Sequence, residues 1–390
     1  MQPKLLELQF SQLQSEWSKA KYNNYSDLRK KEYHTKLAII ISALEKENFQ
    51  SFDDTEITQR FHIISFLFKS LEFLNNSTTS TIPFEIVYVL SEALKDWSSA
   101  DEYIIVTSLI NDLNGFSFDN SLMFNGFIYK DIELLYGVNF DKRLVQINLP
   151  LSLSRDYLAN VVLYHELGHF IDRKYEITRV IYIEILDLVA SGNLKLHEQE
   201  EIFKYFPYLS DINPVNWLKD NYYPFNYFSN HIAEYFCDLF ASQYIKDCSN
   251  QYLNYITLNQ KNYSNTHPST PNRIDFVEVF LKGTPSFLIN QYKEIIFKIT
   301  RVNVERKEKE VDSKNFESLI PVEIQESKEL HGLFIYGWNV WLDDWDNIKS
   351  QSNIGFDLSQ VKVYEILNNL IEKSIGNFIV RTEWELAKKS

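Results

Sequence analysis

The chain has 390 residues, of which 45% are hydrophobic, and a formal net charge of -14 at pH 7. This length favours two or three structural units that each bury their own interior, and the acidic balance excludes wholesale binding to nucleic acids or anionic membranes, because phosphate contacts need clustered Lys and Arg. The two cysteines, Cys237 and Cys248, are too few for a disulfide scaffold or a cysteine-rich zinc site.

The N-terminus and the apolar stretches predict a soluble, cytoplasmic protein. Residues 1–17 lack the basic start, apolar run and small-residue cleavage site of a secretory signal. The longest aliphatic stretch, residues 37–44, is far shorter than the roughly 20 residues that span a bilayer. We therefore expect no membrane span and no nucleic-acid partner.

Residues 1–100 are predicted to form a helical N-terminal region, because apolar residues recur there at three-to-four spacing. Its helices are predicted at residues 9–20, 32–47, 60–74 and 84–97. The pattern then changes to short β-branched and aromatic runs bounded by Gly, Asn, Asp and Pro, which favour strands. These strands are predicted at residues 102–109, 127–137 and 142–150.

The second half of the chain is again predicted to be mostly helical. A long helix is expected over residues 152–175, with Ser154 as its N-cap, and another over 229–246. The three prolines and many aromatics of residues 205–228 favour an irregular segment. Further on, a helix is expected near 284–299, and the charged stretch 301–319 reads as a solvated connection.

These patterns predict a mainly helical α+β chain of four parts. They are a helical N-terminal region at 1–100, a central domain at 101–300, a charged linker at 301–329 and a helical C-terminal region at 330–390.

The stretch VVLYHELGHFID, residues 161–172, contains the pattern HExxH. On a helix His165 and His169 lie on one face one turn apart, so both can offer nitrogens to one zinc ion. Glu166 lies beside such an ion without ligating it and can take a proton from zinc-bound water as the water attacks a carbonyl. The alternative is a core helix that happens to contain histidine. Gly168 is costly within a helix and indicates a close approach there.

The predicted helix 229–246 supplies candidates for a third ligand. Glu234 and Asp238 lie four apart on one face, and no Lys or Arg occurs between residues 229 and 244 to neutralise them. Glu234 could ligate the metal while Asp238 accepts the outer N–H of a ligand histidine. The alternative is a solvent-facing acidic edge. His231, on the same face as Glu234, is either another donor or a capping or packing residue.

Three segments in order, HELGH at 165–169, EYFCD at 234–238 and THPSTPNRI at 266–274, resemble the signatures of a peptidase family. They are similar to HExxH, ExxxD and HP...R in the gluzincins grouped with the CaaX prenyl endopeptidase and the heat-shock membrane metalloprotease. The resemblance covers roughly residues 100–300. It implies a zincin-like core, made of a small sheet and the HExxH helix, between helical flanks.

The resemblance also implies roles for individual residues. The zinc ligands would be His165, His169 and Glu234, one catalytic Zn2+ would be the cofactor, Glu166 would be the general base and Asp238 would orient a ligand histidine. His267 and Arg273 match the HP...R segment, which implies that they stabilise the oxyanion or order the site. The alternatives are a plain turn residue for His267 and a surface ion pair for Arg273. Cys237 stands where this group usually has Ala.

A substrate peptide of such an enzyme would add to an edge strand. The candidate is LVQINLP, residues 144–150, in which Gln146 and Asn148 alternate with apolar residues as in a half-exposed strand. The aromatics of residues 205–228 either roof the cleft or fill a core.

The leading hypothesis is a zinc metalloendopeptidase that hydrolyses peptide bonds of a protein or peptide by Glu-assisted attack of zinc-bound water. One alternative is a narrowly specific regulatory protease or toxin that a partner protein opens, with the helical flanks as the candidate partner surface. The other is a zincin-like scaffold without catalytic activity.

Overall fold

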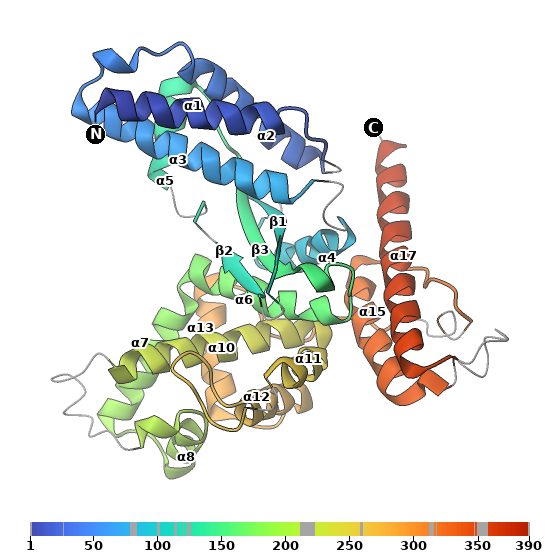
Figure 1. The fold of residues 1–390 in the computed structure, drawn as a ribbon. Coiled ribbons are helices and arrows are strands. Elements are labelled where there is room, and N and C mark those ends of the chain that lie inside the picture. Colours follow the sequence, from blue (N-terminus) through green and yellow to red (C-terminus); the bar gives the residue numbers. More distant parts are fainter. Residues whose placement is uncertain are drawn as a thin grey trace. The chain divides into compact units, whose positions relative to one another are not determined.

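A computed structural model describes most of the chain (Figure 1). It describes all residues except 1, 26, 79–83, 100–101, 113–114, 120, 123–125, 211–222, 258–259, 312–315, 317, 347, 349–357 and 389–390.

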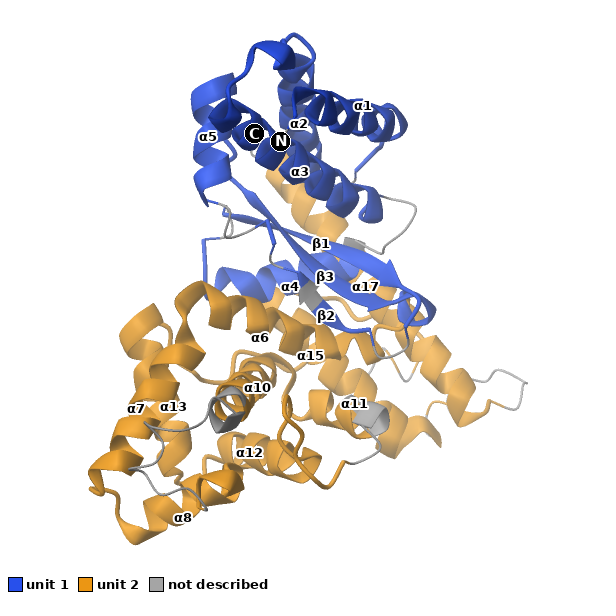
Figure 2. Cartoon of the chain, turned by 60° about the vertical axis from the view of Figure 1, so that its left-hand side comes forward, with its two compact units in different colours: residues 1–154 blue, residues 155–390 orange. Residues whose placement is uncertain are grey.

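The chain divides into two compact units, residues 1–154 and 155–390 (Figure 2). The expected boundary at residue 100 falls inside the first unit, and those near 300 and 330 fall inside the second. All the sequence-predicted site residues belong to the second unit.

The first unit is a group of helices with a small sheet. Its described helices are α1 (Pro3–Ala20), α2 (Leu28–Leu44), α3 (Asp54–Asn76), α4 (Phe84–Lys95), α5 (Gly126–Tyr136) and the short 3-10 helices η1 (Phe49–Ser51) and η2 (Leu151–Leu153). The start of α3 is set by a capping box, in which Asp53 and Glu56 each bond the backbone N–H of the other. Helix α3 packs against α1, α2 and β1, and so carries the core of this unit.

The sheet has three strands, β1 (Tyr103–Ile110), β2 (Ser117–Asp119) and β3 (Arg143–Pro150), in the order β1-β3-β2. Strands β1 and β3 are parallel, with Tyr103 opposite Arg143, and β2 is antiparallel to β3. Two of the three strand predictions are confirmed. The mainly helical α+β class is confirmed as well.

The predicted strand at residues 127–137 is wrong, because this segment forms helix α5. Its buried side chains, Ile128, Tyr129 and Ile132, follow helical spacing and contact the N-terminal core. The β-branched and aromatic residues of this segment favoured a strand prediction. Its buried side chains, however, recur at the spacing of a helix.

The prediction that LVQINLP is a half-exposed edge strand is also wrong. It forms β3, the central strand, with β1 on one side and β2 on the other. Its polar residues serve the sheet: Gln146 Nε2 donates to Asn148 Oδ1 at 2.9 Å, and Asn148 Nδ2 donates to Ser117 Oγ of β2 at 2.9 Å. The polar residues that alternate with apolar ones in this strand therefore form side-chain hydrogen bonds within the sheet and do not mark an exposed edge.

Among the described residues of the second unit, the regular elements are all helices. Its α-helices are α6 (Val162–Tyr175), α7 (Ile177–Ser191), α8 (Leu196–Tyr205), α10 (Tyr223–Ile245), α11 (Cys248–Thr257), α12 (Thr270–Lys282), α13 (Phe287–Thr300), α15 (Ser327–Asn339) and α17 (Gln360–Ala387). Short turns of 3-10 helix are η3 (Ala159–Val161) and η4 (Pro207–Leu209), and η5 (Val340–Asp344) is a π-helical turn. Helix α10 is central, since it packs against α6, α7, α11, α12 and α15.

The helix predicted at 152–175 begins only at Val162, so Ser154 is not its N-cap. Just before α6, hydrogen bonds to other helices fix the backbone at Leu158, and residues 159–161 form a 3-10 turn. Leu158 N donates to Asn368 Oδ1 of α17 at 3.0 Å, and Leu158 O accepts from Trp338 Nε1 of α15 at 3.0 Å. Helix α10 starts earlier than predicted, at Tyr223, while residues 211–222 of the expected aromatic segment lie outside the described residues.

Residues 301–311 of the charged stretch form neither helix nor strand, but part of this predicted solvated connection is anchored to the unit. Lys307 N donates to Gln243 O at 2.7 Å, and Val304 is buried. A charged composition therefore did not make this connection a free linker. In the part of the chain that the structure describes, every helix is too short or too polar to cross a bilayer.

Candidate metal centre

Helices α6 and α10 approach closely at Gly168. A Cβ atom on Gly168 would lie 2.9 Å from the Cα of Cys237, a distance that real side chains do not reach. The absent side chain therefore lets α10 lie against the face of α6 that carries the two histidines. This explains why a residue that weakens an isolated helix occurs inside HELGH.

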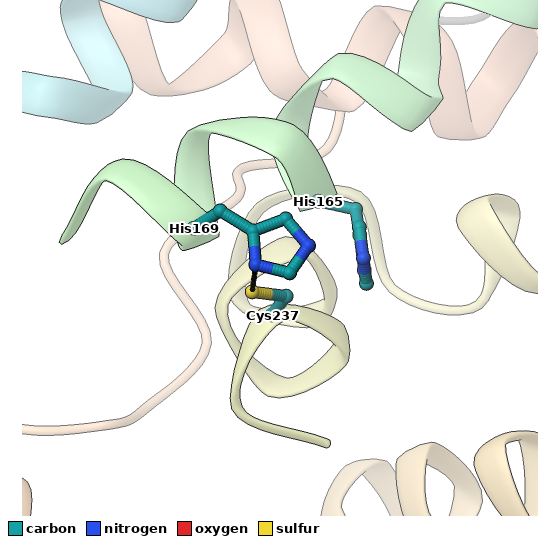
Figure 3. Close-up of side chains that lie close together, drawn as sticks. All are labelled: His165, His169 and Cys237. Atoms are coloured by element: carbon teal, nitrogen blue, oxygen red, sulfur yellow. Dashed lines mark hydrogen bonds between the residues drawn. The ribbon is translucent and has the colours of Figure 1, made fainter. Parts of the chain in front are cut away.

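Glu234 of α10 lies between the two histidines of α6. His165 Nε2 is 3.4 Å from Glu234 Oε2, and His169 Nε2 is 3.5 Å from Glu234 Oε1. Figure 3 shows both imidazoles projecting from α6 toward the same side, with Cys237 of α10 beside His169. The structure thus brings together the three residues that the sequence proposed as ligands.

Asp238 and Arg273 form a buried ion pair behind these residues. Arg273, on α12, donates from Nε and Nη2 to the two carboxylate oxygens of Asp238, both at 2.7 Å. Its Nη1 lies 3.2 Å from Glu234 Oε2. Arg273 is only 4% exposed, so the alternative of a surface ion pair is wrong for it.

Asp238 also contacts His165, whose Nδ1 is 3.0 Å from Asp238 Oδ1. Arg273 Nη2 is 3.3 Å from the same nitrogen, and one of its two hydrogens is directed at Asp238 Oδ1. Because the contact with the Asp238 carboxylate is the shorter of the two, we assign His165 Nδ1 as a donor to Asp238, which leaves Nε2 to face Glu234. Glu234 and Asp238 are both buried, so the alternative of a solvent-facing acidic edge is wrong.

The charges of the site shift the pKa values of its members. Burial opposes ionisation of Glu234 and Asp238, but Arg273 holds the pKa of both carboxyl groups below the ordinary value. Burial likewise disfavours a charged His165, but Glu234 and Asp238 raise its pKa to about 10. Without a metal, protonated His165 and Arg273 thus balance the two carboxylates.

Glu166 is in a different environment. It is half-buried, and burial raises the pKa of its carboxyl group to about 7. A carboxylate with a pKa near the working pH can both take up and return a proton. Its surroundings therefore suit the general base predicted at this position.

His267 lies at the edge of the group, on the turn before α12. Its Nε2 is 3.7 Å from Glu234 Oε1, and its side chain is 52% exposed. Ser264 fixes the turn, because its backbone N–H donates to His267 O at 2.8 Å and its Oγ accepts from His267 N at 3.0 Å. His267 is therefore both a turn residue and a neighbour of the candidate ligands.

His231 does not face the ligand group. Its Nε2 donates to Ser264 O at 2.9 Å, and its Nδ1 is 3.1 Å from the hydroxyl of Tyr208. The fully buried ring thus ties the turn that carries His267 to helix α10. This agrees with the packing alternative.

Cys237 has a contact that the sequence analysis did not predict. Its Sγ lies 3.2 Å from His169 Nδ1, and the buried thiol has a pKa raised well above its ordinary value by desolvation. His165, His169 and Cys237 present ligand atoms that all lie within 4.8 Å of one another. A signal was present, since Cys237 follows Glu234 by three residues and therefore lies on the same face of the helix.

Glu234 gives a direct test of whether a metal fits here. Its Oε2 is buried and has no hydrogen-bond partner, although His165 and Arg273 lie near it. A buried carboxylate oxygen without a partner is costly, and a cation shared with the two histidine nitrogens would satisfy it. Two imidazoles and one carboxylate are a donor set typical of catalytic zinc. The residues present therefore fit zinc.

No protein-family model, curated protein or solved structure gives a significant match to this chain.

Proposed function

We propose that the chain is a zinc-dependent endopeptidase with a gluzincin-type site, in which His165, His169 and Glu234 hold one zinc ion. The observation that carries the proposal is the buried Glu234 oxygen without a hydrogen-bond partner, which lies 3.4 Å from His165 Nε2, while the other carboxylate oxygen lies 3.5 Å from His169 Nε2. The order HELGH, EYFCD and THPSTPNRI supports the family assignment.

The residues have distinct tasks in this proposal. Zinc, when bound, supplies a Lewis acid that polarises the scissile carbonyl and makes water more acidic. Glu166 takes a proton from the attacking water and returns it to the leaving amine, so that the peptide bond is replaced by a carboxyl group and a free amine. In the metal-free protein burial raises the pKa of Glu166 to about 7, which supports a role in proton transfer.

Arg273 and Asp238 would act on the ligands and not on the substrate. The bidentate pair fixes the Asp238 carboxylate, which in turn orients His165. His267 is an exposed donor 3.7 Å from Glu234 and is the candidate for a hydrogen bond to the developing oxyanion. The substrate is a protein or peptide.

The test compares the parent with Glu166→Gln, which keeps the shape of the side chain but removes its basicity. We expect both proteins to bind about one zinc per chain, while the variant loses at least about a hundredfold in peptide cleavage, because a general base contributes on the order of 10²–10⁴ in rate. New N-termini are counted in cells that make either protein, so that the natural substrate is included. Equal cleavage by the two proteins would exclude the mechanism.

The two alternatives predict different results in the same comparison. A partner-gated protease leaves an unfolded generic protein intact but produces Glu166-dependent N-termini in cells. A scaffold without activity gives no such N-termini in either assay. Absence of zinc from protein purified without chelators would exclude the metal centre itself.

A further inference from the structure

We infer that Cys237 is a positioning residue whose sulfur fixes the tautomer of His169, so that the other ring nitrogen, Nε2, is offered to the metal. This inference rests on the proposed zinc function, since it concerns the orientation of one proposed ligand. It assigns a task to the position where the resembling peptidase group usually has Ala.

The two nitrogens of His169 face different neighbours. Nδ1 lies 3.2 Å from Cys237 Sγ, and Nε2 lies 3.5 Å from Glu234 Oε1. Figure 3 shows the Nδ1 side of the ring turned to the sulfur and the other ring nitrogen turned away from it. A neutral imidazole that donates from Nδ1 carries no proton on Nε2, which is the form that binds a metal through Nε2.

Two consecutive residues of helix α10 each contact one of the two histidines. Asp238 accepts from Nδ1 of His165, and Cys237 faces Nδ1 of His169. The partners differ in strength, because the Asp238 carboxylate is ionised and sulfur is a weak acceptor. The second histidine is thus oriented without a further negative charge beside Glu234.

This geometry favours an orienting sulfur over a ligating one. A sulfur that shared the metal with Glu234 would lie on the Nε2 side of His169, whereas Cys237 contacts Nδ1. A thiolate would also add a third buried negative charge beside Glu234 and Asp238.

The sulfur is held in place by the packing of the two helices. Cys237 is fully buried, and a Cβ atom on Gly168 would lie 3.2 Å from its Sγ. The absence of a side chain on Gly168 therefore leaves room for the sulfur between the two helices. Alanine fits too, but it leaves His169 Nδ1 without this partner.

The experiment measures zinc affinity by competition with a chelator for the parent, Cys237→Ala, Cys237→Ser and Cys248→Ala. We expect Cys237→Ala to bind zinc about tenfold more weakly, as is typical when an orienting partner of a ligand is removed. Cys237→Ser retains affinity close to that of the parent, because its hydroxyl can accept from Nδ1. Cys248→Ala, which removes the other buried thiol, is the matched control and leaves affinity unchanged.

A cobalt-substituted sample separates an orienting sulfur from a ligating one. We expect the parent to lack the intense near-ultraviolet charge-transfer band of a cobalt-thiolate bond. If the parent shows that band and Cys237→Ala loses it, Cys237 is a ligand and the inference is wrong. Unchanged zinc affinity in Cys237→Ala also overturns it. A parent that binds zinc but does not cleave peptides contradicts the peptidase proposal and leaves the inference standing.

Discussion

At the scale of single residues, the site depends on charges that compensate one another away from water. Glu234, Asp238 and Arg273 are each less than 9% exposed, and each is close to an opposite charge. Removing one partner of a buried pair leaves the other without compensation, which costs more than the pair contributes. Arg273 has two acidic partners and is therefore the residue on which this balance depends.

We predict that Arg273→Met lowers the free energy of unfolding of the metal-free protein by about 3–5 kcal/mol. Chemical denaturation in the presence of a chelator measures it. Arg179→Met is the control, because the ion pair of Arg179 with Glu176 is exposed and its loss changes stability by less than about 1 kcal/mol. Equal losses for the two variants would show that the buried network is not a source of stability.

At the scale of elements, the site is made by the contact between α6 and α10. Both helices follow from their sequences, but neither carries a complete ligand set. His165 and His169 come from one helix and Glu234 from the other, and the close approach at Gly168 brings them together. Backbone separation therefore controls the distances from Glu234 to both histidines.

We predict that Gly168→Ala destabilises the protein by about 1–3 kcal/mol, although Ala favours helix more than Gly does. The added methyl group would meet the backbone of Cys237, which cannot rotate away, so the helices must separate. Thermal unfolding measures the loss, and zinc affinity falls in the same variant. Gly126→Ala is the control, because nothing lies within 4 Å of its Cβ position, and a matching loss there would contradict the packing argument.

At the scale of the whole molecule, the chain forms two compact units, and the first contains a hydrophobic core made of its own residues. Lys30 in the first unit is buried, and burial lowers its pKa to about 8 despite the attraction of Asp27. Its Nζ donates to Ser77 Oγ. Between this pKa and the usual value of 10.5, the unfolded chain holds the proton that the folded chain has lost. Stability therefore rises with pH across that window.

We predict that Lys30→Met raises the free energy of unfolding at pH 7 by about 2 kcal/mol, because the cost of burying the charge exceeds the lost bond to Ser77. The gain declines above pH 8 and is absent near pH 10.5, where the lysine is neutral in both states. Denaturation of variant and parent at several pH values measures the difference. A gain that does not change with pH would mean that packing, and not charge, is its cause.

The sequence alone determined the local chemistry of this protein. The helical repeat alone places residues four apart on one face of a helix. Two sets were therefore predictable before any tertiary contact was known: His165 and His169 with Glu166 beside them, and Glu234 with Asp238. Two of the three strands followed from composition and bounding turn residues, and many of the helices followed from periodicity. Composition misled at α5, which is a helix, and the alternation in β3 was interpreted as an edge strand although β3 is central.

Only the tertiary structure decided which helices contact each other and which atoms of each side chain face a partner. It brought Arg273 of α12 behind Asp238, made His231 an anchor for the turn at Ser264, and placed Cys237 against the outer nitrogen of His169. None of these contacts lies within one helical turn. They depend on how closely two backbones can approach each other. The helical repeat of either segment alone does not predict that distance.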